Sequence, residues 1–202
     1  MGFIKKLFGG ASPHPIIIVS GLPRSGTSMM MRMLEQGGLP VLTDGIREAN
    51  EDNPRGYYEF ERVKKLPEGD AAWLPEAQGK VVKIIAALLM HLPETHMYKV
   101  LFMRRNMDEI LASQKRMLVR RGEDAESVSD DEMAQLFEKH LAQIHAWMDR
   151  QSNLAYLDVD YNAMLANPTP IVAEIQDFLK RDLDFEAMVA VVDPDLYRQR
   201  AV

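Results

Sequence analysis

The segment that decides the fold of this chain is residues 16–28, IIIVSGLPRSGTS. Its first five residues form an apolar run of the kind that parallel sheets bury on both faces. A turn containing Gly21 and Gly26 follows, and residues 27–36 then predict a helix that ends at a pair of glycines. A strand, a tight turn and a helix in this order predict the first unit of an α/β domain.

The rest of the chain continues this alternation. Short apolar segments predict strands at residues 81–85, 98–103 and 154–159. Helices are predicted at residues 107–121, at residues 130–151 behind a capping box of Ser129 and Glu132, and from Pro168 or Pro170 onward. We therefore expect a single domain over residues 1–202, a three-layer α/β/α fold around a mostly parallel sheet of about four or five strands.

The turn at residues 21–28 predicts a site for a phosphate-like group. Gly21 and Gly26 permit the backbone angles and the close approach that a cradle of N–H groups needs. The start of the following helix adds its positive dipole end, and the hydroxyls of Thr27 and Ser28 add further donors. A turn of this kind with nothing bound is the simpler alternative.

The basic residue of this turn is in an unusual place. The eight residues nearly match the nucleotide-binding pattern GxxxxGK[ST], but Thr27 occupies the lysine position and the cation is Arg24. A triphosphate with Mg²⁺ lacks its lysine here. A 5′-phosphosulfate carries less charge and needs no metal, so it fits this turn better.

Residues 23–27, PRSGT, resemble the 5′-phosphosulfate loop of sulfotransferases, whose pattern is P-[KR]-[ST]-G-T. The resemblance implies a P-loop fold and the donor 3′-phosphoadenosine 5′-phosphosulfate (PAPS), used without a metal. It also implies that Arg24 steadies the bridging oxygen and the departing 5′-phosphate. The donor-binding residues that it predicts in this loop are Pro23, Arg24, Ser25, Gly26, Thr27 and Ser28.

A second element of the same family follows the strand predicted at residues 98–103. Its pattern, R-[DN]-P-x-D-x-x-x-S after a strand, binds the donor's 3′-phosphate, and Arg105 and Ser113 take the arginine and serine positions. Met107 replaces the usual proline and Glu109 stands at the acidic position. A planar guanidinium at the carboxyl end of a central strand suits a phosphate dianion. The alternative is a surface salt bridge from Arg105 to Asp108 or Glu109.

The catalytic base is less well defined. Cytosolic sulfotransferases have K-T-H after the second strand, and this chain keeps Lys83 but has Ile85 where the histidine is expected. Residues 53–61, NPRGYYEFE, look like an N-P-x-G-[YF]-x-E element of bacterial relatives, so Glu59 is the preferred base and Lys83 is expected near the sulfonate. Other candidates for the base are Glu61, Glu48, Asp44, His91 and His96.

The remaining resemblances are looser. Residues 157–161, 164–168 and 178–179 are similar to the family's C-terminal strand and helix, which mostly concern core packing. Arg198 and Arg200 resemble the basic C-terminal segment that closes over the 3′-phosphate in many members. Residues 39–79, which are rich in turn-forming residues, are expected to border the acceptor, and residues 1–14 to form an N-terminal arm.

Composition restricts the partners. The chain has no cysteine, which excludes disulfides and thiolate catalysis and fits a reducing cytoplasm. A formal net charge of −6 disfavours nucleic acid, and no run is long and apolar enough to predict an integral membrane segment. We expect a small-molecule or glycan acceptor and no metal site. The amphipathic helix at 130–151 is a candidate homodimer face.

Two other functions stay open on the sequence alone. A P-loop nucleotide kinase or NTPase is one, because residues 154–158, LAYLD, resemble a strand that ends in a Mg²⁺-binding aspartate. A non-catalytic scaffold that binds PAPS or its product, adenosine 3′,5′-bisphosphate (PAP), is the other, because the expected histidine is missing.

Overall fold

The computed structural model describes residues 14–46, 56–124 and 128–192, which contain a five-stranded sheet. Every neighbouring pair of strands is parallel, and the order is β2-β3-β1-β4-β5. The strands are β1 (Ile16–Gly21), β2 (Val41–Leu42), β3 (Val81–Lys83), β4 (Tyr98–Arg104) and β5 (Leu154–Asp160). The predicted parallel α/β sheet is confirmed.

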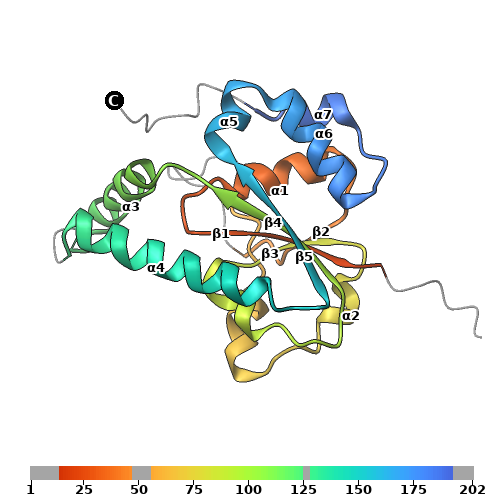
Figure 1. Ribbon diagram of the computed structural model, residues 1–202, viewed down its shortest axis with the longest axis horizontal. Coiled ribbons are helices and arrows are strands. Elements are labelled where there is room, and N and C mark those ends of the chain that lie inside the picture. The colour runs from red at the N-terminus through yellow and green to blue at the C-terminus, as the bar shows by residue number, and fades with distance from the viewer. Residues whose placement is uncertain (1–13, 47–55, 125–127, 193–202) are drawn as a thin grey trace, which may run out of the picture.

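Helices cover both faces of this sheet (Figure 1). One layer consists of α1 (Thr27–Gln36), α5 (Tyr161–Ala166), α6 (Pro168–Leu179) and α7 (Phe185–Val189). The opposite layer consists of α4 (Asp130–Met148), α2 (Leu74–Ala77) and the 3₁₀ helices η1 (Glu61–Glu68) and η2 (Ala86–His91). Helix α3 (Met107–Arg121) pairs with α4 and extends beyond the sheet edge in Figure 1.

β1 is central because both of its faces are apolar. Ile17 and Val19 face the core beneath α1, whereas Ile16 and Ile18 face the core beneath α4. All four are at most 1% exposed. The methionines of α1 belong to the first of these cores, so the helix is anchored firmly behind the turn that precedes it.

Most predicted elements are found, with changes at their ends. α1 and α3 have the predicted bounds, and the capping box of Ser129 and Glu132 starts α4. β3 ends at Lys83 rather than at residue 85, because the chain turns into η2 there. The two-residue β2 at the sheet edge was not predicted, because it is too short to show a periodic pattern.

The strand order fixes where a ligand can bind. From β1 the chain crosses through α1 to β2 at one edge and continues to β3 beside β1, and it later crosses to β4 on the other side of β1. In open α/β sheets, the carboxyl ends of strands at such a reversal border the ligand crevice. The turn after β1 and the junction after β4 therefore lie at the expected place.

Candidate functional site

The turn between β1 and α1 is a tight loop closed by its own polar groups. Both the backbone N and Oγ of Ser25 donate hydrogen bonds to the carbonyl of Leu22, at 3.2 and 2.7 Å. Gly21 has φ 144°, and a Cβ there would lie 2.6 Å from Ser25 Oγ. Arg24 has φ 72°, which is costly for a residue with a side chain and is typical of functional sites.

Helix α1 begins at the end of this loop with its first N–H groups directed toward it. Gly26, at φ 98°, stands at the N-cap and has no side chain to cap the first turn. The first backbone N–H groups of a helix have no acceptor within the helix, so they are suited to an anion. Thr27 and Ser28 occupy this first turn, and Thr27 is 8% exposed.

The β4–α3 junction touches this loop directly. Arg24 Nε donates to Ser113 Oγ at 2.8 Å, and Arg105 Nη1 donates to the Arg24 carbonyl at 2.9 Å. Asn106 caps α3 by accepting from the backbone N–H of Glu109 at 3.3 Å. The two elements that the sequence predicts separately therefore lie in contact.

Arg105 forms a buried ion pair with Glu109. Their Nε and Oε2 atoms are 2.9 Å apart, and the side chains are 8% and 2% exposed. The salt bridge considered as an alternative thus exists, but it is buried rather than on the surface. A guanidinium held by Glu109 on one side and by the Arg24 carbonyl on another has a fixed plane.

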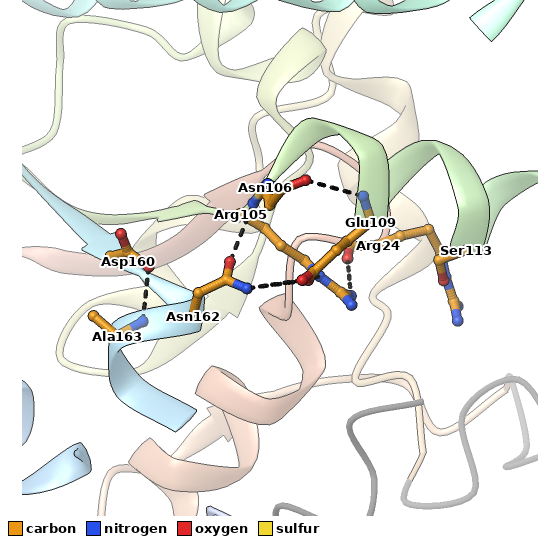
Figure 2. A network of polar contacts seen from close by, with 8 residues as sticks. All are labelled: Arg24, Arg105, Asn106, Glu109, Ser113, Asp160, Asn162 and Ala163. Atoms are coloured by element: carbon orange, nitrogen blue, oxygen red, sulfur yellow. Dashed lines mark hydrogen bonds and ion pairs between the residues drawn. The ribbon is translucent and has the colours of Figure 1, made fainter. Parts of the chain in front are cut away.

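The turn between β5 and α5 completes this arrangement (Figure 2). The Tyr161 ring lies beneath the Arg105 guanidinium, 4.7 Å from Cζ to the ring centroid, and burial raises the pKa of this phenol. The ring also occupies the space that a Cβ on Gly26 would need. Asn162 Nδ2 donates to both carboxylate oxygens of Glu109 at 3.1 Å. We call residues 21–28, 105–113 and 160–163 the strand-end corner.

Sequence reasoning missed the contribution of the β5–α5 turn, which it assigned mostly to core packing. One signal was present. Asp160 follows the β5 pattern and caps α5 by accepting from the Ala163 N–H at 2.9 Å. β5 is the parallel neighbour of β4, so the two carboxyl ends had to meet.

Lys83 connects the strand-end corner to the 39–79 segment. Its Nζ donates to the carbonyl of Tyr57 at 2.7 Å and to Ser28 Oγ at 3.2 Å. Glu59 lies two residues beyond Tyr57, with its side chain 20% exposed and its carboxylate 3.9 Å from Lys64 Nζ. Lys83 therefore contacts the first turn of α1, and Glu59 lies close in sequence to its other partner, Tyr57.

The other candidates for the base have contacts of their own. Asp44 accepts from the backbone N–H groups of Ile46 and Glu61, at 3.1 and 2.6 Å, so it organises its own loop. Glu61 pairs with Lys64 at 2.6 Å. His96 precedes β4, at the opposite end of the strand from Arg105. His91 is exposed at the end of η2.

Three predicted site residues lie outside the described part of the chain: Glu48, Arg198 and Arg200. Residues 1–13 of the predicted N-terminal arm and residues 53–55 of the NPRGYYEFE element also lie outside it.

A cavity of about 180 Å³ lies on the α4 side of the same strand ends. It is lined by apolar side chains from the loop, β4, α3 and α4, with a few charged residues: Leu22, Met103, Arg104, Arg105, Met107, Ile110, Glu138 and Leu141. It is therefore a space with both polar and apolar lining next to the turn at residues 21–28.

Asp158, the residue that resembled a Mg²⁺ ligand, is engaged with other side chains. Its Oδ1 is 3.0 Å from His145 Nε2, and its Oδ2 is 3.8 Å from Arg104 Nη1. Among the described residues, no cluster of three or more histidine, aspartate or glutamate side chains has a metal-binding arrangement. No helix in these ranges has the length and apolarity needed to cross a membrane.

Comparison with solved structures finds sulfotransferase domains. The sulfotransferase domain of the olefin synthase from Synechococcus PCC 7002 superposes with a TM-score of 0.54 at 17% identity, over 95% of this chain and 85% of that domain. The sulfotransferase domain of the curacin biosynthetic pathway gives 0.51 at 16% identity, over 88% of this chain and 77% of that domain. No curated protein matches the chain. At these identities the likeness concerns the fold.

The family assignment comes from the sequence itself. The model of a family described as "Sulfotransferase family" matches residues 56–186, which include Lys83, Arg105 and Ser113. The match begins after the turn at residues 21–28, so it is independent of the PRSGT pattern. With a family match over more than half of its length and a fold shared with sulfotransferase domains, this chain belongs to the sulfotransferase family.

Proposed function

We propose that this protein transfers a sulfuryl group from PAPS to a hydroxyl or amine of a small-molecule or glycan acceptor and releases PAP. The observation that carries this proposal is the contact between the phosphate loop and the β4–α3 junction. Arg24 Nε reaches Ser113 at 2.8 Å and Arg105 reaches the Arg24 carbonyl at 2.9 Å. Because the two elements touch, the 5′ and 3′ phosphates of a single nucleotide can reach both of them.

The donor's two ends would be held by different elements. The 5′-phosphosulfate would lie against the start of α1, where the N–H groups and hydroxyls of residues 25–28 meet the helix dipole. The 3′-phosphate would bind Arg105 and Ser113 through charge-assisted hydrogen bonds. Arg24 belongs to both, because its backbone is in the loop and its side chain contacts α3.

The transfer itself is an in-line displacement. The acceptor oxygen or nitrogen forms a bond to sulfur while the bond from sulfur to the bridging oxygen breaks. The electron pair of that bond stays on the 5′-phosphate of PAP, and the acceptor proton passes to a base. Positioning and charge stabilisation dominate such loose transition states. Arg24 and Lys83 would stabilise the leaving phosphate and the sulfonate, and Glu59 would take the proton.

Ligand-induced stabilisation tests the donor assignment. At a concentration of PAP one hundred times its Kd, we expect a rise in melting temperature of about 5–10 °C, and no comparable rise with ATP and Mg²⁺. Arg105→Met and Ser113→Ala should lose most of this shift. Arg62→Met is the matched control, because Arg62 pairs with Asp70 at the surface, outside the strand-end corner.

Two results would contradict the proposal. A shift with ATP and Mg²⁺ but none with PAP would indicate the kinase or NTPase function instead. PAP binding without consumption of PAPS, even with water or a broad panel of alcohols and amines as acceptors, would indicate a non-catalytic scaffold.

The base requires its own test once an acceptor is identified. Glu59→Gln should lower kcat by about 10²–10⁴-fold with little change in PAP affinity, because general base catalysis contributes that much. Glu61→Gln is the control, two residues away in the same segment. Nearly normal turnover in Glu59→Gln would exclude Glu59 as the base.

A further inference from the structure

We propose that Asn162 is a positioning residue for 3′-phosphate recognition, because it orients Glu109 and Glu109 in turn fixes the plane of Arg105. This inference rests on the proposed function. It assigns a role in donor specificity to the β5–α5 turn, which is 53 residues away from Glu109 in sequence.

The amide of Asn162 is used from both ends. Its Nδ2 donates to Oε1 and Oε2 of Glu109, each at 3.1 Å. Its Oδ1 accepts from the backbone N–H of Asn106 at 3.1 Å. The Glu109 carboxylate needs a donor and the Asn106 N–H needs an acceptor, so only one orientation of the Asn162 amide satisfies both. Figure 2 shows Asn162 between the start of α3 and the turn that carries it.

The turn that carries Asn162 is itself held in place. Asp160 caps α5 through the Ala163 N–H at 2.9 Å, and Tyr161 is buried between the phosphate loop and Arg105. Asn162 therefore extends from an anchored backbone. Its two contacts fasten the start of α3 to the end of β5 immediately beside the predicted phosphate ligand.

The surroundings make the orientation of Glu109 matter. The Glu109 side chain is 2% exposed and the Arg105 side chain 8%, so water cannot readily replace a lost hydrogen bond. Without the Asn162 amide, the carboxylate would turn toward other donors and the Arg105 plane would follow. A guanidinium binds a phosphate well in a restricted set of planes, so the 3′-phosphate would lose affinity.

A neutral amide also suits the charge of the ligand. Arg105 and Glu109 already offset each other, and the incoming phosphate is an anion. An aspartate at position 162 would place a second carboxylate beside Glu109 and repel that anion. Asn162→Asp is therefore expected to harm binding of the 3′-phosphate more than loss of the hydrogen bonds alone.

The test compares ligands with and without the 3′-phosphate. Kd values for PAP and for adenosine 5′-monophosphate are measured by calorimetry on the full chain. The Kd for adenosine 5′-monophosphate divided by the Kd for PAP reports 3′-phosphate recognition. We expect Asn162→Leu, which keeps the branched shape, to reduce this ratio about tenfold, as for one lost hydrogen bond of about 1.4 kcal/mol. Asn162→Asp should reduce it further.

The matched control is Asn153→Leu. Asn153 is also half-buried and also donates through Nδ2, to the carbonyl of His96 at 2.8 Å, but it precedes β5 at the other end of the strand. Its ratio of Kd values should equal that of the unchanged protein. If Asn162 were purely structural, Asn162→Leu would lower the unfolding free energy without changing the ratio of Kd values.

The possible outcomes separate this inference from the proposed function. If the unchanged protein prefers PAP and Asn162→Leu retains the full preference, the inference is wrong and the proposed function stands. If the unchanged protein shows no preference for PAP, the proposed donor site is wrong. If both Asn162 variants fail to fold while Asn153→Leu folds, the residue is structural and the inference is overturned.

Discussion

The strand-end corner and the 39–79 segment are linked by Lys83 but are built differently. In the corner, the ion pair of Arg105 and Glu109 has side chains that are only 8% and 2% exposed. In the 39–79 segment, the comparable pair of Arg62 and Asp70 has side chains that are 44% and 23% exposed. The same chemical pair is thus buried in one region and solvated in the other.

The difference indicates which region defines the chemistry and which can vary. A buried network has few acceptable rearrangements, because each unpaired group costs its full desolvation energy. Short helices held by solvated ion pairs can change at little cost. A donor shared by all members of a family would require a buried network like that of the strand-end corner. Acceptors that differ between members would favour a solvated segment like residues 39–79.

The largest expected effect comes from breaking the buried pair. Glu109→Ala leaves Arg105 buried without its carboxylate, and we expect the unfolding free energy to fall by about 3–5 kcal/mol. Asp70→Ala removes the same kind of partner from Arg62 and should hardly change the denaturation midpoint. Urea denaturation of both variants measures the contrast. Equal effects of the two substitutions would show that the regions do not differ as described.

The second effect compares two glycines with similar backbones. Gly26→Ala places a Cβ against the Tyr161 ring at φ 98°, so strain and overpacking together should cost about 2–4 kcal/mol and weaken PAP binding. Gly69→Ala has φ 88° and no atom within 4 Å of the new Cβ, so it should cost about 1 kcal/mol from backbone strain alone. Equal losses in both variants would exclude a role for Tyr161.

How much of this was accessible from the sequence differs between the same two regions. Gly26, Arg105 and Ser113 were predicted because each belongs to a short motif with a fixed relation to a strand and a helix. Their contact followed from the parallel sheet, which brings carboxyl ends together. The fold and the order of its principal elements were predictable for the same reason.

Contacts between distant segments were not predictable in this way. Glu109 was noted at its motif position, but its bond with Asn162 depends on two segments 53 residues apart, and no local pattern encodes that. The amide of Asn162 and the ring of Tyr161 look like ordinary helix-start residues in the sequence. The 39–79 segment was recognised only as irregular, because its elements are too short to show periodicity.

The third effect concerns the link between the regions. Lys83→Met removes hydrogen bonds to Tyr57 and Ser28, so we expect a loss of about 1–2 kcal/mol in unfolding free energy. PAPS turnover with water as acceptor should fall about 10²–10³-fold, as for loss of one group that stabilises developing charge, with less than about a threefold change in PAP affinity. Lys80→Met, which removes a surface pair with Glu76, is the control. A large loss of PAP affinity would instead place Lys83 in donor binding.

The smallest effect is the pH dependence of the solvated pair. The hydrogen bond from Arg62 lowers the pKa of Asp70 below its ordinary value. A carboxylate with a lowered folded-state pKa stabilises the protein above its unfolded-state pKa, and this contribution disappears as the pH falls through the folded-state pKa. The difference in melting temperature between the unchanged protein and Asp70→Asn should therefore be small at pH 6 and vanish toward pH 2. A difference that is large at pH 6, or that grows on acidification, would mean that this pair is not the weak, solvated interaction that distinguishes the 39–79 segment from the strand-end corner.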